Sequence, residues 1–273
     1  MDVVKIANQV FLFCILFEVV GIMTIPFFGT LGAQTAIYFM TFMFALFIYM
    51  KHRDELKIEL EPVNIGKMIH TMSIAMCGVP VAMLLNAFAG LFQKSGADET
   101  GDVNVYPVWL SVVAFAVVPA VVEEFVFRGV IFKSLSKKDV RGAVIVSSLF
   151  FAVLHFSFGS VMYGFLFGVI FAWVYHVTDS IIYPIAMHMT FNTINVYLSY
   201  ADFENVSAGI AIIIAILGAV GFIILLYLFF RRNIPCGIEI DSEGKSQVWS
   251  LMTREGYVTM GICVMIICLL LMM

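Results

Sequence analysis

Long apolar runs separated by short polar segments make up most of the chain. A transmembrane helix needs about 20 mostly apolar residues, and about nine runs meet or approach that length. They cover approximately residues 10–28, 31–50, 68–92, 108–132, 142–158, 161–177, 181–197, 208–230 and 257–273. The fifth to seventh runs are short and closely linked, so we expect them to pack as tight helical hairpins. This pattern predicts an all-α fold, a polytopic membrane bundle of about eight to nine transmembrane helices.

The composition indicates the same class of protein. Hydrophobic residues make up 62% of the chain and charged residues 12%, and the mean hydropathy is +1.02, which is not typical of a water-soluble domain. The longest polar stretch, residues 233–256, is too short to bury a core of its own. We therefore expect a single membrane domain over residues 1–273, with a motif-bearing core at 108–200. The net charge of -4 gives no basis for nucleic-acid binding.

The distribution of lysine and arginine predicts an orientation, because these residues are retained on the cytoplasmic side of a membrane. Three alternate loops are basic, and they carry Lys51, Arg53, Lys57 and Lys67, then Lys133, Lys137, Lys138 and Arg141, then Arg231, Arg232, Lys245 and Arg254. The intervening loops are acidic, with Asp98, Glu99 and Asp102 in one and Asp202 and Glu204 in another. This alternation predicts a cytoplasmic N terminus and an outer C terminus.

Two adjacent glutamates interrupt the apolar run at 108–132. Charge at membrane depth is costly, so such carboxylates usually face a partner, a cavity or a substrate path. Residues four apart share a helix face, so Glu124 and Arg128 should form an ion pair in the favoured acid-first order. Glu123 points elsewhere and is left without a counter-charge, as suits a group that takes a proton from water and returns it to a leaving amine.

Two further motifs supply the other groups that a hydrolytic site needs. Phe151 and His155 share one helix face, and His188 and Asn192 share another. If His155 meets Glu123 across a helix interface, the two can activate one water, while His188 and Asn192 donate hydrogen bonds to the oxyanion. This reading is peptide-bond hydrolysis within the membrane.

A zinc site is a second interpretation of the same residues. Glu123, His155 and His188 form a ligand set suited to a catalytic zinc ion with one open position. Residue types alone leave both interpretations open.

Structural roles are the alternative for several of these polar residues. The two glutamates with Arg128 can be a buried salt-bridge cluster that holds helices together, and a lone histidine in a transmembrane helix, such as His70 or His176, is more often an interhelical hydrogen-bonding residue. Glu18 is either an inward-facing polar contact or an acid near the membrane interface, and we favour the second.

Pro119 lies one turn before Glu123 and predicts a kink that helps to open a cavity there.

Taken in order, the three motifs resemble the signature motifs of the CPBP family, the CAAX proteases and bacteriocin-processing enzymes, which includes the type II CAAX prenyl endopeptidases. The resemblance covers roughly residues 108–200, and no motif position is missing. It implies a glutamate-dependent intramembrane endopeptidase in which Glu123 and His155 activate water and His188 and Asn192 form the oxyanion hole. We expect no cofactor, but the family was long described as metal-dependent, so zinc stays an open alternative.

The resemblance also implies a substrate class and a location. The partners would be the lipid bilayer and a membrane-anchored, prenylated or leader-containing peptide, with no nucleic acid. The protein would be a multi-pass protein of a prokaryotic cell membrane, with its site accessible from the cytoplasmic side. The alternatives are a non-enzymatic scaffold or bacteriocin-immunity protein, and an ion-coupled transporter, although no inverted repeat favours transport.

One feature of the predicted topology does not fit this site. Glu123 and His188 fall nearer the cytoplasmic ends of their runs, whereas His155 falls toward the outer end of a short run. The fifth helix must therefore start later than its apolar run, or be tilted or displaced within the bilayer.

Overall fold

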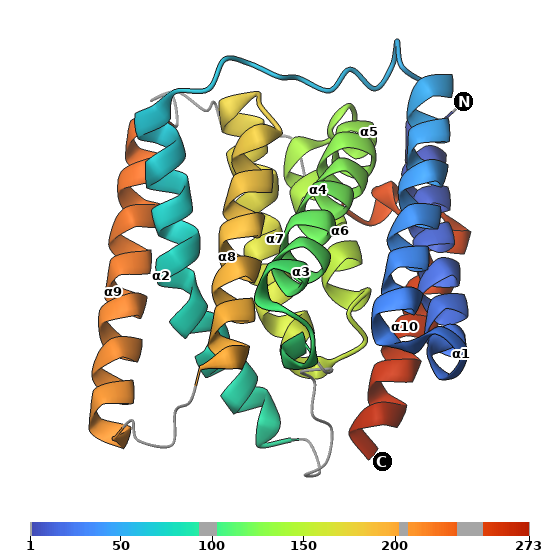
Figure 1. The fold of residues 1–273 in the computed structure, drawn as a ribbon. Helices are drawn as coiled ribbons and strands as arrows, with labels where there is room; N and C mark the ends of the chain where they lie inside the picture. Colours follow the sequence, from blue (N-terminus) through green and yellow to red (C-terminus); the bar gives the residue numbers. More distant parts are fainter. Residues whose placement is uncertain (1, 93–102, 202–206, 234–247, 273) are drawn as a thin grey trace.

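The computed structural model describes residues 2–92, 103–201, 207–233 and 248–272. Its helices stand side by side in a bundle that carries the N and C termini at opposite ends (Figure 1). Within these residues, five helices are long and apolar enough to cross a membrane: Val3–Lys51, Ile65–Gly90, Val108–Ser136, Phe158–Thr178 and Gly209–Asn233. The predicted all-α, multi-pass membrane bundle is confirmed.

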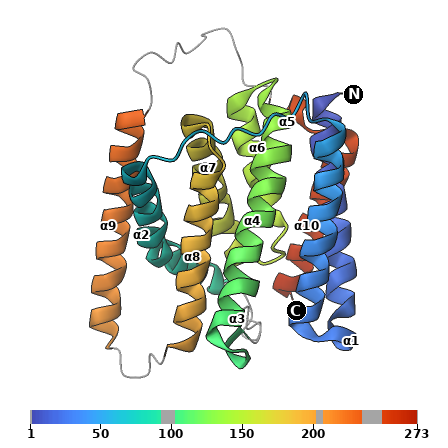
Figure 2. The same cartoon turned by 45° about the horizontal axis from the view of Figure 1, so that its top comes forward.

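Helix α1 (Val3–Lys51) forms an antiparallel hairpin and accounts for the first two predicted spans. Its two arms meet at Gly29, whose φ of 68° and ψ of 172° lie outside the helical region. Glycine adopts a positive φ without steric cost, which explains why the chain reverses there. The arms pack through Phe13 and Phe44, whose ring centroids are 4.3 Å apart, and they lie side by side in both views (Figures 1 and 2).

The opposite side of the bundle is built from four helices that share an aromatic core. They are α2 (Ile65–Gly90), α7 (Phe158–Thr178), α8 (Ile182–Tyr200) and α9 (Ala208–Asn233). Phe167 of α7 packs against Phe191 of α8 and Phe222 of α9, with centroid distances of 4.6 and 5.9 Å. Most side chains of α9 face outward and are apolar, as expected for a helix in contact with lipid.

The central helical stretch carries the two glutamates and contains two π-helical segments. In order it consists of α3 (Val108–Val112), the π-helix η2 (Val113–Val117), α4 (Val118–Glu124), the π-helix η3 (Phe125–Phe132) and α5 (Lys133–Ser136). The wide turn of η2 comes directly before Pro119, which has no backbone donor. The kink predicted at Pro119 is therefore replaced by a π-helical turn just before it. Such π-helical segments often occur at functional sites.

Helix α6 (Val140–Val153) has only 14 residues. At 1.5 Å per residue it is about 21 Å long, which is shorter than the hydrocarbon core of a bilayer at about 30 Å. The helix therefore ends inside the bundle, and the chain turns through Leu154, His155 and Phe156 before α7 begins. This short helix explains how His155, at the end of its run, lies at the depth of Glu123.

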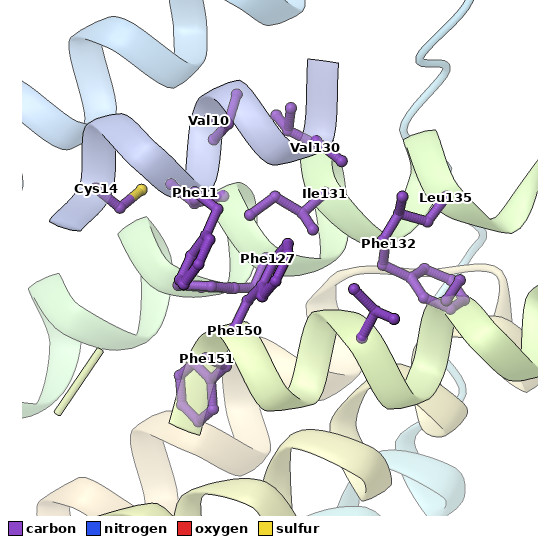
Figure 3. Close-up of a cluster of buried hydrophobic side chains, with 14 of the residues drawn as sticks. Val10, Phe11, Cys14, Phe127, Val130, Ile131, Phe132, Leu135, Phe150 and Phe151 are labelled. Carbon is purple, nitrogen blue, oxygen red and sulfur yellow. The ribbon is translucent and has the colours of Figure 1, made fainter. Parts of the chain in front are cut away.

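The first arm of α1, η3 and α6 enclose a second apolar core, whose side chains point toward one another in Figure 3. The rings of Phe11 and Phe150 stack at 3.8 Å with planes 2° apart. Helix α10 (Arg254–Met272) packs against α1, and Asn8 joins α1 to the preceding short helix η4 (Val248–Leu251) by donating to the carbonyl of Leu251 at 3.0 Å. A short helix η1 (Val103–Val105) precedes α3.

The first two predicted basic loops lie together at the end of the bundle that carries the N terminus, whereas most of the third, residues 234–247 with Lys245, lies outside the described residues. Lys133 forms an ion pair with Glu59 of the 52–64 linker, and Lys138 approaches Asp2 at 3.6 Å. We call this the N-terminal end, and the opposite end, where α1 reverses, the Gly29 end. The assignment of the N-terminal end to the cytoplasm stays a prediction.

Candidate active site

The ion pair predicted between Glu124 and Arg128 is present. Arg128 Nη1 lies 2.9 Å from Glu124 Oε1, and the two side chains are 1% and 0% exposed. Arg128 Nη2 also donates to the carbonyl of Gly168 on α7 at 3.1 Å. A Cβ at Gly168 would lie 2.9 Å from the Cβ of Ser148 on α6, so glycine permits the close approach of α6 and α7 around the guanidinium.

Two aromatic rings cover the Arg128 guanidinium. Its Cζ lies 4.7 Å from the ring centroid of Phe151 and 5.4 Å from that of Phe171. A guanidinium over an aromatic face is attracted by the negative charge of the ring face, most strongly where water is excluded. Phe151 therefore supports the site by holding the cation that neutralises Glu124.

His188 joins the two glutamates. Its Nδ1 lies 2.9 Å from Glu124 Oε1, and its Nε2 lies 3.8 Å from Glu123 Oε2. An ionised carboxylate can only accept a hydrogen bond, so Nδ1 donates to Glu124 and Nε2 is directed toward Glu123. The ring also meets Phe151 edge to face at 5.7 Å, which fixes its plane.

These contacts form a buried cluster of four ionisable side chains. Glu123 and Glu124 bring two negative charges, and Arg128 brings one positive charge. His188 is the second basic group of the cluster, and it contacts both glutamates. Buried charges are tolerated when they are paired in this way.

Glu123 has a second partner that the sequence analysis did not identify. Tyr38, on the second arm of α1, donates its hydroxyl to Glu123 Oε1 at 2.8 Å. Glu123 is 8% exposed, and its Oε2 forms no hydrogen bond with the described residues. A buried tyrosine hydroxyl usually finds a hydrogen-bond partner. Tyr38 lies one turn after Gln34 in an apolar run, and this position was the sequence feature that could have indicated a buried polar partner for it.

A cavity of about 410 Å³ adjoins Glu123 and brings it together with His155. The walls come from α1, from Glu123 and from the turn after α6, and the lining residues are Glu18, Ile22, Ile25, Thr30, Ala33, Gln34, Ile37, Tyr38, Glu123, Leu154, His155 and Phe156. Glu18 therefore faces the site and not the membrane interface, contrary to our prediction for it.

His155 lies in the turn after α6, and not on the helix face that its spacing from Phe151 predicted. The two rings are nevertheless in contact, with centroids 5.1 Å apart. Nδ1 of His155 lies 3.0 Å from the carbonyl oxygen of Phe151. A carbonyl only accepts, so Nδ1 carries the proton and Nε2 of the neutral ring is a proton acceptor.

The motifs resembling those of CAAX proteases thus converge on one buried site. A family model described as type II CAAX prenyl endopeptidase Rce1-like matches residues 105–194. The resemblance to the CAAX proteases is confirmed. The Rce1-like segment extends from the start of the central helical stretch through most of α8 and carries all three motifs, whereas α1 lies outside it. No curated protein and no solved structure matches the chain significantly.

Asn192 belongs to the Rce1-like segment, and its location is known from its position on α8. It lies one turn beyond His188 on α8 and is half-buried. Helix α8 packs against η2 and α4, so Asn192 is on a helix that adjoins the glutamates. Its predicted pairing with His188 at an oxyanion stays a prediction.

The zinc interpretation does not fit the side chains as they are placed. Among the described residues, no group of three or more His, Cys, Asp or Glu side chains is arranged to hold a metal ion. The hydrogen bonds that Nδ1 of His188 and of His155 make to Glu124 and to the carbonyl of Phe151 leave Nε2 of both rings available and do not themselves exclude a metal. The metal requirement of this protein stays a prediction that metal analysis of the purified protein can test.

The predicted structural role of His70 agrees with its contacts. Its Nε2 lies 2.8 Å from the carbonyl oxygen of Leu225 on α9, so it links α2 to α9 away from the glutamates. His176 packs its ring against Phe132 and Trp173 and is likewise outside the cavity.

Proposed function

We propose that this protein is an intramembrane endopeptidase that hydrolyses a peptide bond of a membrane-anchored or lipidated substrate. The observation that carries the proposal is the shared cavity of Glu123 and His155, two proton acceptors at membrane depth. The match to Rce1-like endopeptidases over residues 105–194 supports the same reaction. A purely structural salt-bridge cluster would need neither the cavity nor a carboxylate oxygen of Glu123 that forms no hydrogen bond with the described residues.

In the proposed reaction, Glu123 and His155 act on one water in the cavity. Glu123 Oε2 takes a proton as the water oxygen attacks the carbonyl carbon of the scissile peptide bond. The resulting tetrahedral oxyanion collapses when the leaving nitrogen receives that proton, and the C–N bond breaks. The products are a new carboxylic acid and a new amine, so all atoms of the water are accounted for.

His188 and Asn192 would stabilise the oxyanion in this scheme. Nδ1 of His188 is committed to Glu124, so the ring can donate from Nε2 only when it carries a second proton. Asn192 would add an amide donor from the same helix face.

The family match and the membrane location support a proposal for the substrate class. An Rce1-like protein is expected to act on a prenylated CAAX tail, and a leader-containing peptide is the other candidate. Because the lining of the cavity combines apolar side chains with polar groups, an extended, lipid-anchored peptide segment is a suitable ligand.

The position of the cavity revises the expected side of access. The lining runs from Glu123 toward Ile25 and Thr30, which flank the turn at Gly29. The basic linkers lie at the other end of the bundle. We therefore propose access from the Gly29 end, which is the outer side if the basic loops are cytoplasmic.

Cleavage by a purified pair of variants tests the function. Glu123→Gln keeps the shape of the side chain and an oxygen that can accept from Tyr38, so we expect a folded, membrane-inserted protein that no longer cleaves a peptide cleaved by the wild type. The assay is mass spectrometry of a prenylated CAAX peptide and a leader peptide in liposomes. Equal turnover by Glu123→Gln would sink the mechanism, and no Glu123-dependent cleavage of either peptide would favour the scaffold reading.

A further inference from the structure

The cavity has two walls of different origin. One wall is Glu123 with the turn at residues 154–156, and it belongs to the Rce1-like segment. The other wall is the α1 hairpin, outside that segment, and it provides the polar side chains of Glu18, Thr30, Gln34 and Tyr38. Tyr38 acts on Glu123. Among the described residues, Glu18, Thr30 and Gln34 form no hydrogen bond with Glu123 or His155, so they are available to contact a substrate.

Glu18 is a carboxyl group in this cavity without a lysine or arginine side chain beside it among the lining residues. The two basic side chains of the charge cluster are both engaged by Glu123 and Glu124, Arg128 by Glu124 and His188 by both. No lysine or arginine is among the lining residues, which are all within the described part of the chain. A carboxylate at membrane depth is costly without a counter-charge and usually marks a partner or a substrate path.

A second observation points to a ligand in the same space. Glu123 also lines the cavity, is more than nine-tenths buried, and has an Oε2 without a hydrogen bond to the described residues. Beside the two carboxylates lie apolar side chains of α1, including Ile22, Ile25 and Ile37. A long side chain with an apolar stem and a cationic head matches both surfaces, because lysine and arginine bury their methylenes against apolar groups.

We propose that Glu18 determines specificity by binding a lysine or arginine side chain of the peptide substrate. This inference rests on the proposed function, because the peptide must lie in the cavity beside Glu123. Glu18 contacts the substrate away from the reacting atoms, while Glu123 and His155 act on the scissile bond. The cation supplies the counter-charge that the free cavity lacks.

A positional peptide set measures this preference. Each position near the cleaved bond is occupied in turn by lysine, norleucine or glutamate, and kcat/KM is measured in liposomes. At one position we expect the wild type to favour lysine over norleucine by about 10- to 100-fold, the range of a hydrogen bond between charged groups. Glu18→Gln should lose that preference, and Glu18→Lys should favour glutamate at the same position.

Gln34→Ala is the matched control, because Gln34 lines the same cavity from the facing arm of α1 but carries no charge. It should change all rates by a similar factor and leave the ratio of lysine to norleucine peptides unaltered. Identical ratios in the wild type and Glu18→Gln, with both proteins folded, overturn the proposal. A lysine preference lost equally in Gln34→Ala overturns it as well, because the effect would then not depend on charge.

Binding separates failure of this inference from failure of the proposed function. Fluorescence anisotropy of the same labelled peptides is measured on Glu123→Gln and on the double variant Glu123→Gln with Glu18→Gln. Tighter binding of the lysine peptide only when Glu18 is present supports the inference even if no peptide is cleaved. Glu123-dependent cleavage without any effect of Glu18 on cleavage or binding keeps the function and rejects the inference.

Discussion

Replacing Tyr38 by phenylalanine removes one oxygen atom and, with it, the donor to Glu123 Oε1 at 2.8 Å. A hydrogen bond to a charged group contributes about 1.5–3 kcal/mol, and each 1.4 kcal/mol in a barrier changes a rate about tenfold. If the bond orients Glu123 for proton transfer, kcat should fall by about 10- to 100-fold. The apparent KM should change little, because Tyr38 acts through Glu123 and not on the substrate.

Steady-state cleavage of a peptide in liposomes gives kcat and KM separately. Tyr49→Phe is the matched control, since Tyr49 lies on the same arm of α1 but packs against Phe125 at 5.7 Å and does not line the cavity. We expect its kcat to stay within about twofold of the wild type, as for substitutions away from special features. An unchanged kcat in Tyr38→Phe would refute the positioning role, and a raised KM with normal kcat would assign Tyr38 to substrate binding.

Four further outcomes are expected. Glu124→Gln leaves Arg128 buried without its counter-charge, so the free energy of unfolding should fall by about 3–5 kcal/mol; an unchanged thermal unfolding curve in detergent contradicts this. Asn192→Ala should lower kcat by about 100- to 1,000-fold with little change in KM, and a preserved kcat with weakened binding would make Asn192 a substrate-positioning residue. Purified active enzyme should contain no stoichiometric zinc and keep its turnover after chelation, and loss on chelation with recovery on adding zinc would overturn the metal-free scheme. In a cysteine-free background, Thr30→Cys should react with an impermeant maleimide from the side opposite to Arg53→Cys, and labelling of both from one side would reject access from the Gly29 end.

Local spacing predicted the features that depend on one helix. The i,i+4 relation gave the Glu124–Arg128 pair, which the structure contains at 2.9 Å, and the apolar runs gave the helices. The break between the first two runs corresponds to the reversal at Gly29.

Features that depend on how helices dock were not predictable in the same way. Spacing along α8 suggested only that His188 and Asn192 share a face, and it gave no sign that His188 would contact Glu124 on another helix. Tyr38 and Glu18 reach the site because the α1 hairpin packs beside α4, a long-range contact that no local pattern encodes. The end of α6 at Val153 could not be predicted from the apolar pattern either, because the apolar run continues past Val153 into the turn.

The end of α6 within the bundle bears on how water, the second reactant of the proposed hydrolysis, reaches a site within the membrane. Irregular backbone at membrane depth is tolerated only where protein buries it or where it borders water. Residues 154–156 form such backbone, and they line the cavity beside Glu123. The halted helix therefore places polar backbone and the His155 side chain beside the cavity. In the proposed reaction, the same break in the helix that brings His155 to Glu123 also provides the polar border at which a water nucleophile would be held.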